Sequence, residues 1–93
     1  MKSTKVLQEA EQRRLAWRCR RGLLELDIVL QRFVKDKFSE LSWQEVEVFD
    51  GLLDLPDNEF WDLIKTDKPQ KDAVLTRIIA KLNTASQQAL REY

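Results

Sequence analysis

The side chains that could do chemistry in this 93-residue chain are mainly charged ones, because the sequence has no histidine and a single cysteine, Cys19. Without histidine the chain lacks the usual general base and the commonest metal ligand, and one thiolate cannot build a zinc site. Catalysis would have to rest on carboxylates, lysines or a hydroxyl group. We therefore predict no catalytic residue and no metal site, and we do not expect an enzyme. An enzyme that uses the carboxylates of the acidic middle of the chain, residues 36–62, is the least supported alternative.

Cys19 lies among arginines, whose positive charge lowers a thiol pKa. The chain has no second cysteine to resolve an oxidised thiol and no histidine to activate it. An inert, partly buried thiol is the favoured interpretation. A single cysteine also indicates a reducing compartment.

Five arginines crowd the first part of the chain: Arg13, Arg14, Arg18, Arg20 and Arg21. On a helix, Arg14, Arg18 and Arg21 would lie along one side, as a stripe that could bind nucleic-acid phosphates or an acidic protein surface. Internal pairing is the third possibility, because residues 36–62 hold nine Asp or Glu against one Lys. The formal net charge of zero disfavours nucleic-acid binding, which stays an alternative function.

The pattern Arg21-Gly22-x-x-Glu25 is the most informative one. In the expected helix, Arg21 and Glu25 share a face beside the bare backbone of Gly22. A glycine inside a helix costs about 1 kcal/mol relative to alanine, whereas an exposed ion pair of this spacing contributes only about 0.3–0.5 kcal/mol. Local energetics do not explain this glycine. We predict that a tight packing contact or a docking partner does, and we favour a partner.

The elements that would position these residues are helices. The first is expected over about residues 4–20, with four possible inward positions: Leu7, Ala10, Leu15 and Trp17. The second, over about residues 22–34, has a wide apolar stripe at helical spacing. Its members are Leu23, Leu24, Leu26, Ile28, Leu30, Phe33 and Val34. This helix is predicted to be the centre of the core.

Three shorter helices follow. Ser42 and Glu45 have the spacing of a capping box at the start of the third, and Asp57 is the predicted N-cap of the fourth. The fourth ends at Lys68-Pro69, and the fifth spans about residues 70–83. Their expected inward residues are Val46, Phe49, Leu52 and Leu53, then Phe60, Trp61 and Ile64, then Leu75, Ile78, Ile79 and Leu82.

Two further groups have simple interpretations. Trp43, Phe60 and Trp61 are taken as packing residues. The carboxylates of the middle segment are taken as a solvated face, since they lack the spacing of a calcium-binding loop. These carboxylates are Asp36, Glu40, Glu45, Glu47, Asp50 and Asp54.

The sequence predicts an all-α protein, a compact bundle of about five short helices. Two glycines and two prolines leave room for few turns, and no strand pattern is present. We expect a single helical domain over residues 1–93, with a core over about 5–83 and a polar tail over 84–93 that could fray. No apolar stretch is long enough to cross a membrane, and the first residues lack the apolar core of a signal peptide. We expect a cytoplasmic monomer without membrane insertion.

The segment from Trp17 through Arg21, Gly22 and Glu25 to Asp27 resembles the bacterial succinate dehydrogenase assembly factors, the small SdhE-like proteins. The family signature Arg-Gly-x-x-Glu is matched by Arg21, Gly22 and Glu25. The likeness extends over about residues 10–82, including Leu52-Leu53, Phe60-Trp61-Asp62-Leu63 and Lys68-Pro69. The chain departs from the family at Leu55-Pro56-Asp57, where relatives often carry the proline after the aspartate.

The resemblance implies a non-enzymatic helper that binds the succinate dehydrogenase flavoprotein subunit, with the fumarate reductase flavoprotein as a further partner. It would promote covalent attachment of FAD, hold no cofactor stably itself, and leave the bond to the flavin to a histidine of the partner. The implied partner-binding residues are Arg21, Gly22, Glu25, Trp17, Arg18 and Asp27. Arg21 would bond to the partner, Gly22 would permit close approach, and Glu25 would orient Arg21 or bond across the interface. Relatives have also been described as antitoxins, so an antitoxin-like regulator using the arginine-rich first helix stays an alternative.

Overall fold

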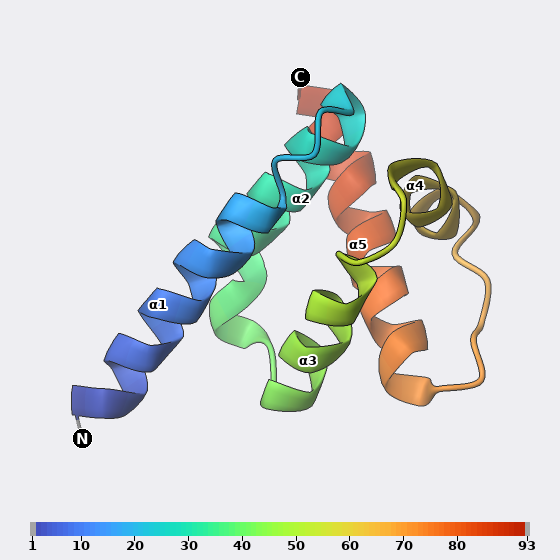
Figure 1. Cartoon of the computed structure of the whole chain (residues 1–93). Helices are drawn as coiled ribbons and strands as arrows, with labels where there is room; N and C mark the ends of the chain where they lie inside the picture. The colour runs from blue at the N-terminus through green and yellow to red at the C-terminus, as the bar shows by residue number, and fades with distance from the viewer. Residues whose placement is uncertain (1, 93) are drawn as a thin grey trace.

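The computed structural model describes the backbone of residues 2–92 and the side chains of residues 8–91. It contains α1 (Lys2–Arg18), α2 (Leu24–Lys37), a 3₁₀ turn η1 (Phe38–Glu40), α3 (Trp43–Leu52), α4 (Asp57–Thr66) and α5 (Ala73–Glu92). No strand occurs within residues 2–92, so the predicted all-α class is confirmed. In Figure 1, α1 and α2 form an antiparallel hairpin, and α5 runs along α2. Helices α3 and α4 also pack against α5.

The core forms around α2, as its apolar stripe predicts. Leu26, Leu30 and Phe33 are fully or almost fully buried. The ring of Phe33 meets that of Phe49 from α3, with centroids 5.3 Å apart and a tilt of 46°. Every inward residue predicted for α3 is buried, together with Phe60 and Ile64 of α4 and three residues of α5, namely Ile78, Ile79 and Leu82.

Several inward assignments are wrong. Trp17, Leu24 and Trp43 are exposed by 72%, 58% and 53%, and Ala10 is exposed as well. Trp43 is the first residue of α3, and its side chain is not among the buried residues of that helix. Conversely, Val29 is buried although the stripe did not include it. Leu7 lies outside the described side chains. Trp61, Leu23 and Leu75 pack against the core while partly exposed.

The capping box at the start of α3 is confirmed, and its glutamate has a second function. Glu45 accepts a hydrogen bond from the backbone N–H of Ser42 (2.9 Å), while the Ser42 hydroxyl accepts from the N–H of Glu45 (3.2 Å). The other carboxylate oxygen accepts from Lys81 Nζ (2.9 Å) and Arg77 Nε (3.2 Å) of α5. Glu45 is thus buried and paired rather than part of a solvated face, and it ties α3 to α5.

Helix α4 begins differently from the prediction. Pro56 occupies the N-cap position, Asp57 is the first helical residue, and no side chain caps the helix. The carboxylate of Asp57 instead accepts from Arg21. Asp67 ends α4 in a left-handed conformation (φ 48°), with its N–H bonded to the carbonyl of Leu63, so the helix stops just before Lys68-Pro69.

Helix α5 continues through residues 84–92, which the sequence assigned to a polar tail that could fray. Ser86 and Ala89 are buried in this stretch. Asn83 Nδ2 donates to the carbonyl of Ile64 at 2.9 Å, which ties the middle of α5 to the end of α4. At the other end, Asp72 accepts from the N–H groups of Val74 and Leu75. None of the helices in the described part of the chain is long and apolar enough to span a membrane.

Replacing Glu45 with glutamine should lower the free energy of unfolding by about 2 kcal/mol near pH 7, because Lys81 and Arg77 lose a buried charged partner. The hydrogen bonds from Lys81 and from the Ser42 backbone, followed by the bond from Arg77, lower the pKa of Glu45 from 4.5 to about 2. A depressed folded-state pKa contributes stability above the unfolded-state value and loses it as the pH falls through the folded-state value. The difference between wild type and E45Q in urea unfolding should therefore narrow below pH 4.5. Glu47→Gln, on an exposed position of α3, is the matched control; an equal loss in both variants would contradict the prediction.

Candidate functional site

The segment Arg21-Gly22-x-x-Glu25 does not lie within one helix, contrary to the prediction. Helix α1 ends at Arg18, with the N–H of Cys19 bonded to the carbonyls of Leu15 and Ala16. Residues 19–23 then form a connection before α2 begins at Leu24. Gly22 lies in this connection with φ +96°, a conformation that L side chains rarely adopt. The glycine is explained by this turn of the backbone, so it carries no penalty of a helix interior.

Asp27, in the first turn of α2, holds the connection in place. Its Oδ1 accepts from the backbone N–H of Arg21 at 2.9 Å, and its Oδ2 accepts from the N–H of Gly22 at 3.0 Å. One carboxylate therefore satisfies two backbone donors of a loop that has no helix or strand partners. Negative charge is also favourable in the first turn of a helix.

The Arg21 side chain points inward and is only 12% exposed. Its guanidinium donates from Nε to Asp57 Oδ1 (2.5 Å), from Nη1 to the carbonyl of Leu53 (2.5 Å), and from Nη2 to the carbonyl of Leu55. The guanidinium also lies 5.7 Å from the ring centre of Phe60. Arg21 makes none of these contacts with Glu25, so a role of Glu25 in orienting Arg21, one of the two considered for it, is not supported. Arg21 clamps the α1–α2 connection onto the turn between α3 and α4.

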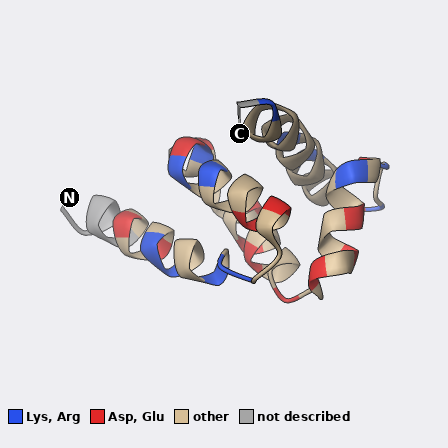
Figure 2. Cartoon of the chain, turned by 90° about the horizontal axis from the view of Figure 1, so that it is seen from above, with Lys and Arg blue, Asp and Glu red and all other residues tan. Residues whose placement is uncertain are grey.

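Arg14 and Arg18 pair with carboxylates of the acidic middle of the same chain. Of the three possibilities for the basic run, internal pairing is therefore the one that the structure shows for these two arginines. Arg14 Nη2 lies 2.9 Å from Asp50 Oδ2, and Arg18 contacts the carboxylates of both Asp50 and Asp54. Burial alone would raise the pKa of Asp50, but the hydrogen bonds and charges of the two arginines outweigh it and lower that pKa. In Figure 2 the basic end of α1 lies beside acidic residues of the neighbouring segments. The expected arginine stripe is thus largely neutralised.

Cys19 is fully buried at the end of α1. Burial raises the pKa of its thiol to about 12, and the opposing charges of Arg21 and Arg18 do not cancel that effect. The thiol is therefore protonated and inaccessible, which agrees with the interpretation of an inert residue. Among the described side chains, no three His, Cys, Asp or Glu are grouped so as to hold a metal ion.

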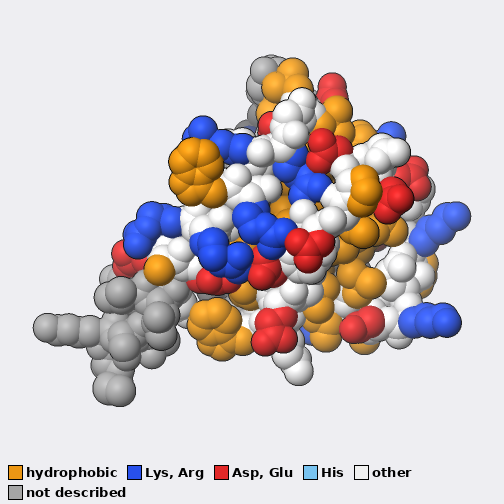
Figure 3. Space-filling view, viewed as in Figure 1, with side chains coloured by type: hydrophobic (Ala, Val, Ile, Leu, Met, Phe, Trp, Pro, Cys, Tyr) orange, Lys and Arg blue, Asp and Glu red, His pale blue; other side chains and the backbone are white. Residues whose placement is uncertain are grey.

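The six predicted partner-binding residues fall into two groups. Arg18, Arg21 and Asp27 are partly buried and hold the connection and its surroundings. Trp17, Gly22 and Glu25 are exposed, and none of the described side chains pairs with the Glu25 carboxylate. Figure 3 shows Lys and Arg side chains gathered over the end of α1 and bordered by acidic ones. The outward group forms a candidate docking surface, which we call the Gly22 surface: Trp17, Gly22 and Glu25.

Sequence reasoning missed two contributors. Asp57 was taken as a helix cap, although it is the anionic partner of Arg21. Arg20 was counted only as part of the basic run, but its guanidinium lies 5.1 Å from the ring centre of exposed Trp17. The opposite charges of the first and middle segments were the signal for the first contact. No pattern in the sequence marked the second.

Comparison with known families identifies the chain. Residues 13–86 match the family model described as the flavinator of succinate dehydrogenase. The chain belongs to this family. The matched range contains the whole connection, its anchor Asp27, and Asp57.

Individual proteins similar to this chain support the same family assignment. An FAD assembly factor SdhE of Coxiella burnetii is 39% identical over 74 residues, which are 80% of this chain and 90% of that protein. One from Methylococcus capsulatus is 38% identical over 76 residues, covering 82% and 92% of the two chains. One from Legionella pneumophila is 39% identical over 67 residues, covering 71% and 85%. The signature residues Arg21 and Gly22 lie on the connection between α1 and α2, and Glu25 lies in the first turn of α2.

Asp27→Ala should loosen the α1–α2 connection without unfolding the bundle. Losing both acceptor oxygens frees the N–H groups of Arg21 and Gly22, and we expect their amide hydrogen exchange to accelerate about tenfold or more. Exchange measured by NMR checks this residue by residue. Glu25→Ala removes an exposed carboxylate from the same helical turn and should leave both amides unchanged. Unchanged exchange in Asp27→Ala would show that other contacts hold the connection.

Proposed function

We propose that this protein promotes covalent attachment of FAD to the flavoprotein subunit of succinate dehydrogenase, by binding that subunit and without catalysing the reaction itself. The observation that carries the proposal is the family match over residues 13–86, which includes the whole candidate site. Relatives of matching length are named FAD assembly factors. We extend the proposal to the fumarate reductase flavoprotein, and to action in the cytoplasm, where a lone thiol stays reduced.

The chemistry of the chain supports a positioning role. It has no histidine, so the residue that bonds to the flavin would come from the partner. The helper would hold the flavoprotein in the geometry where that residue and FAD are aligned, which is a proximity effect. No cofactor needs to be held stably by the helper in this scheme.

The Gly22 surface supports close approach. Apart from neighbouring residues, no heavy atom lies within 4 Å of the position where a Cβ of Gly22 would stand, so the backbone faces open space. Glu25 offers a carboxylate for a charge-assisted hydrogen bond across the interface, and Trp17 offers a large apolar side chain. Arg21, Arg18 and Asp27 act indirectly in this proposal, because their polar groups are used to shape the surface.

The ion pairs within the chain disfavour the nucleic-acid and antitoxin-like alternatives, which depend on the arginine stripe. Each arginine of the expected stripe pairs with a carboxylate of the chain itself: Arg14 and Arg18 with Asp50, and Arg21 with Asp57. Phosphate binding along the stripe would have to displace these pairs. A protein partner at the Gly22 surface requires no such exchange.

Glu25→Ala should leave the helical content and thermal unfolding of the helper unchanged, because the side chain is exposed and its carboxylate has no partner among the described residues. Loss of a charged hydrogen bond to the partner should weaken binding by about 1.5–3 kcal/mol, or roughly tenfold or more. The measurement is covalent flavin fluorescence of the flavoprotein in a denaturing gel, with FAD in excess and the helper limiting.

Glu47→Ala, an exposed glutamate on α3, is the matched control and should retain full activity. Wild-type rates of flavin attachment with limiting Glu25→Ala would reject the assigned role of Glu25. No stimulation by the wild-type protein would reject the proposed function as a whole.

A further inference from the structure

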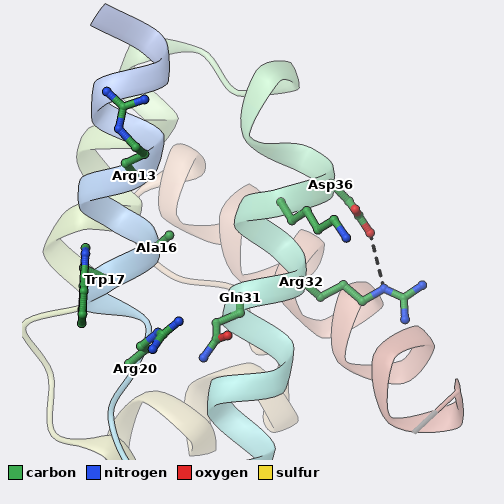
Figure 4. A pocket seen from close by; sticks show the side chains of 8 residues that line it. Arg13, Ala16, Trp17, Arg20, Gln31, Arg32 and Asp36 are labelled. Atoms are coloured by element: carbon green, nitrogen blue, oxygen red, sulfur yellow. Dashed lines mark hydrogen bonds and ion pairs between the residues drawn. The ribbon is translucent and has the colours of Figure 1, made fainter.

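A groove of about 730 Å³ lies between α1 and α2, beside the Gly22 surface. From α1 and its end it is lined by Arg13, Trp17 and Arg20, and from α2 by Arg32, Lys35 and Asp36. Figure 4 shows Arg13 and Trp17 on α1, Arg20 just beyond its end, and Gln31 facing them from α2. We call this the cationic groove. It is separate from the contacts of Arg14 and Arg18 with Asp50 and Asp54.

The charge of this groove is not balanced. Asp36 is the only carboxylate among its lining residues, and Arg32 Nε lies 3.4 Å from its Oδ2. In the described part of the chain, no carboxylate pairs with Arg13, Arg20 or Lys35, all of which are exposed. The arginines on the neighbouring face of α1 have such partners. The groove therefore carries positive charge that no carboxylate among the described residues pairs with, whereas Arg14, Arg18 and Arg21 each have such a partner.

The cationic groove also has a large exposed apolar side chain, that of Trp17. The Trp17 indole is 72% exposed, and the Arg20 guanidinium lies 5.1 Å from its ring centre. Tryptophan and arginine are the residue types most enriched among the energetically dominant residues of protein interfaces. The groove thus offers separate cationic contacts and one broad apolar contact, which suits a ligand carrying carboxylates next to an apolar side chain.

We propose that the cationic groove binds an acidic segment of the protein that docks on the Gly22 surface. Carboxylates of that segment pair with Arg13, Arg20 and Lys35, and an apolar side chain covers the Trp17 indole. The identity of the partner rests on the proposed function, whereas the chemistry of the groove does not. Trp17 belongs to both surfaces, so one partner can contact them together.

Charge complementarity favours an acidic protein segment over a nucleic acid. A phosphate backbone needs a basic path that continues along the molecule. Here the basic surface is interrupted by Asp50 and Asp54 on the adjoining face, and the chain has no net charge. A short peptide segment needs no longer path than the groove supplies.

The first test compares two variants of equal charge change. Arg13→Gln/Lys35→Gln removes two positive charges from the groove, and Lys68→Gln/Lys71→Gln removes two from exposed lysines of the α4–α5 connection. Binding to the FAD-free succinate dehydrogenase flavoprotein is measured by biolayer interferometry. The groove variant should bind about tenfold more weakly at about 50 mM NaCl, mainly through slower association, and the difference should shrink at about 300 mM. The control should bind like wild type. Equal effects in both variants, or none in either, would overturn the proposal.

The second test needs no flavoprotein and so separates this proposal from the proposed function. In a Trp43→Phe/Trp61→Phe background, Trp17 is the only tryptophan, and its emission is followed during titration with a short Glu-rich peptide carrying a central leucine. A saturable change that is lost in Arg13→Gln/Lys35→Gln, and is absent with the Gln-for-Glu peptide, supports the groove. No response to the acidic peptide overturns the proposal. A response to a single-stranded RNA oligonucleotide that exceeds the peptide response overturns it in favour of nucleic acid.

Discussion

The arrangement of the site depends on the contacts of the guanidinium of Arg21, whose side chain is only 12% exposed. Three of its N–H groups reach the turn between α3 and α4, where the carbonyls of Leu53 and Leu55 follow the end of a helix and have lost helical partners. The planar fork of arginine can serve two carbonyls and the Asp57 carboxylate at once, which the single ammonium of lysine does less well. Arg21 lies in the α1–α2 connection. Its hydrogen bonds to the α3–α4 turn therefore determine where the α1–α2 hairpin contacts the rest of the bundle. Asp27 then fixes the backbone of the same connection from its other side.

The uneven charge along the sequence becomes local neutrality in space. The basic first segment and acidic middle segment meet through Arg14, Arg18 and Arg21, while Glu45 joins α3 to the basic side of α5. These pairs connect elements that are more than thirty residues apart, so they constrain the fold as well as the surface potential. The basic side chains of the cationic groove take no part in these ion pairs. In a chain that pairs Arg14, Arg18, Arg21 and Glu45 internally, a groove with exposed cations that no described carboxylate pairs with supports the proposal of an acidic partner.

The sequence predicted the fold well where the information was local. Helical spacing placed α2 and its core residues, and the pair Ser42 and Glu45 marked the start of α3. It failed where a distant partner decided the outcome. Gly22 was placed inside a helix because the apolar spacing continues past it, although a glycine after a basic run is also a helix-stop signal. Asp57 resembled a cap because its partner, Arg21, is 36 residues away. The residues of the candidate site were chosen from the segment that carries the family resemblance, but their division into holding and exposed groups required the tertiary contacts.

That division changes how the signature is understood. An arginine, a glycine and a glutamate at fixed spacing could be three contacts to a partner, yet only Gly22 and Glu25 face solvent here. Arg21 makes its hydrogen bonds to other residues of the same chain, and these bonds hold the non-helical α1–α2 connection in place. A loop already ordered before binding loses little conformational entropy when a partner docks on it. In the proposed role, a helper that supplies no histidine can align the reactive groups of another protein only as precisely as its own surface is held. In the proposed complex, the Arg21 clamp would therefore be as much a part of the docking surface as the residues that touch the partner.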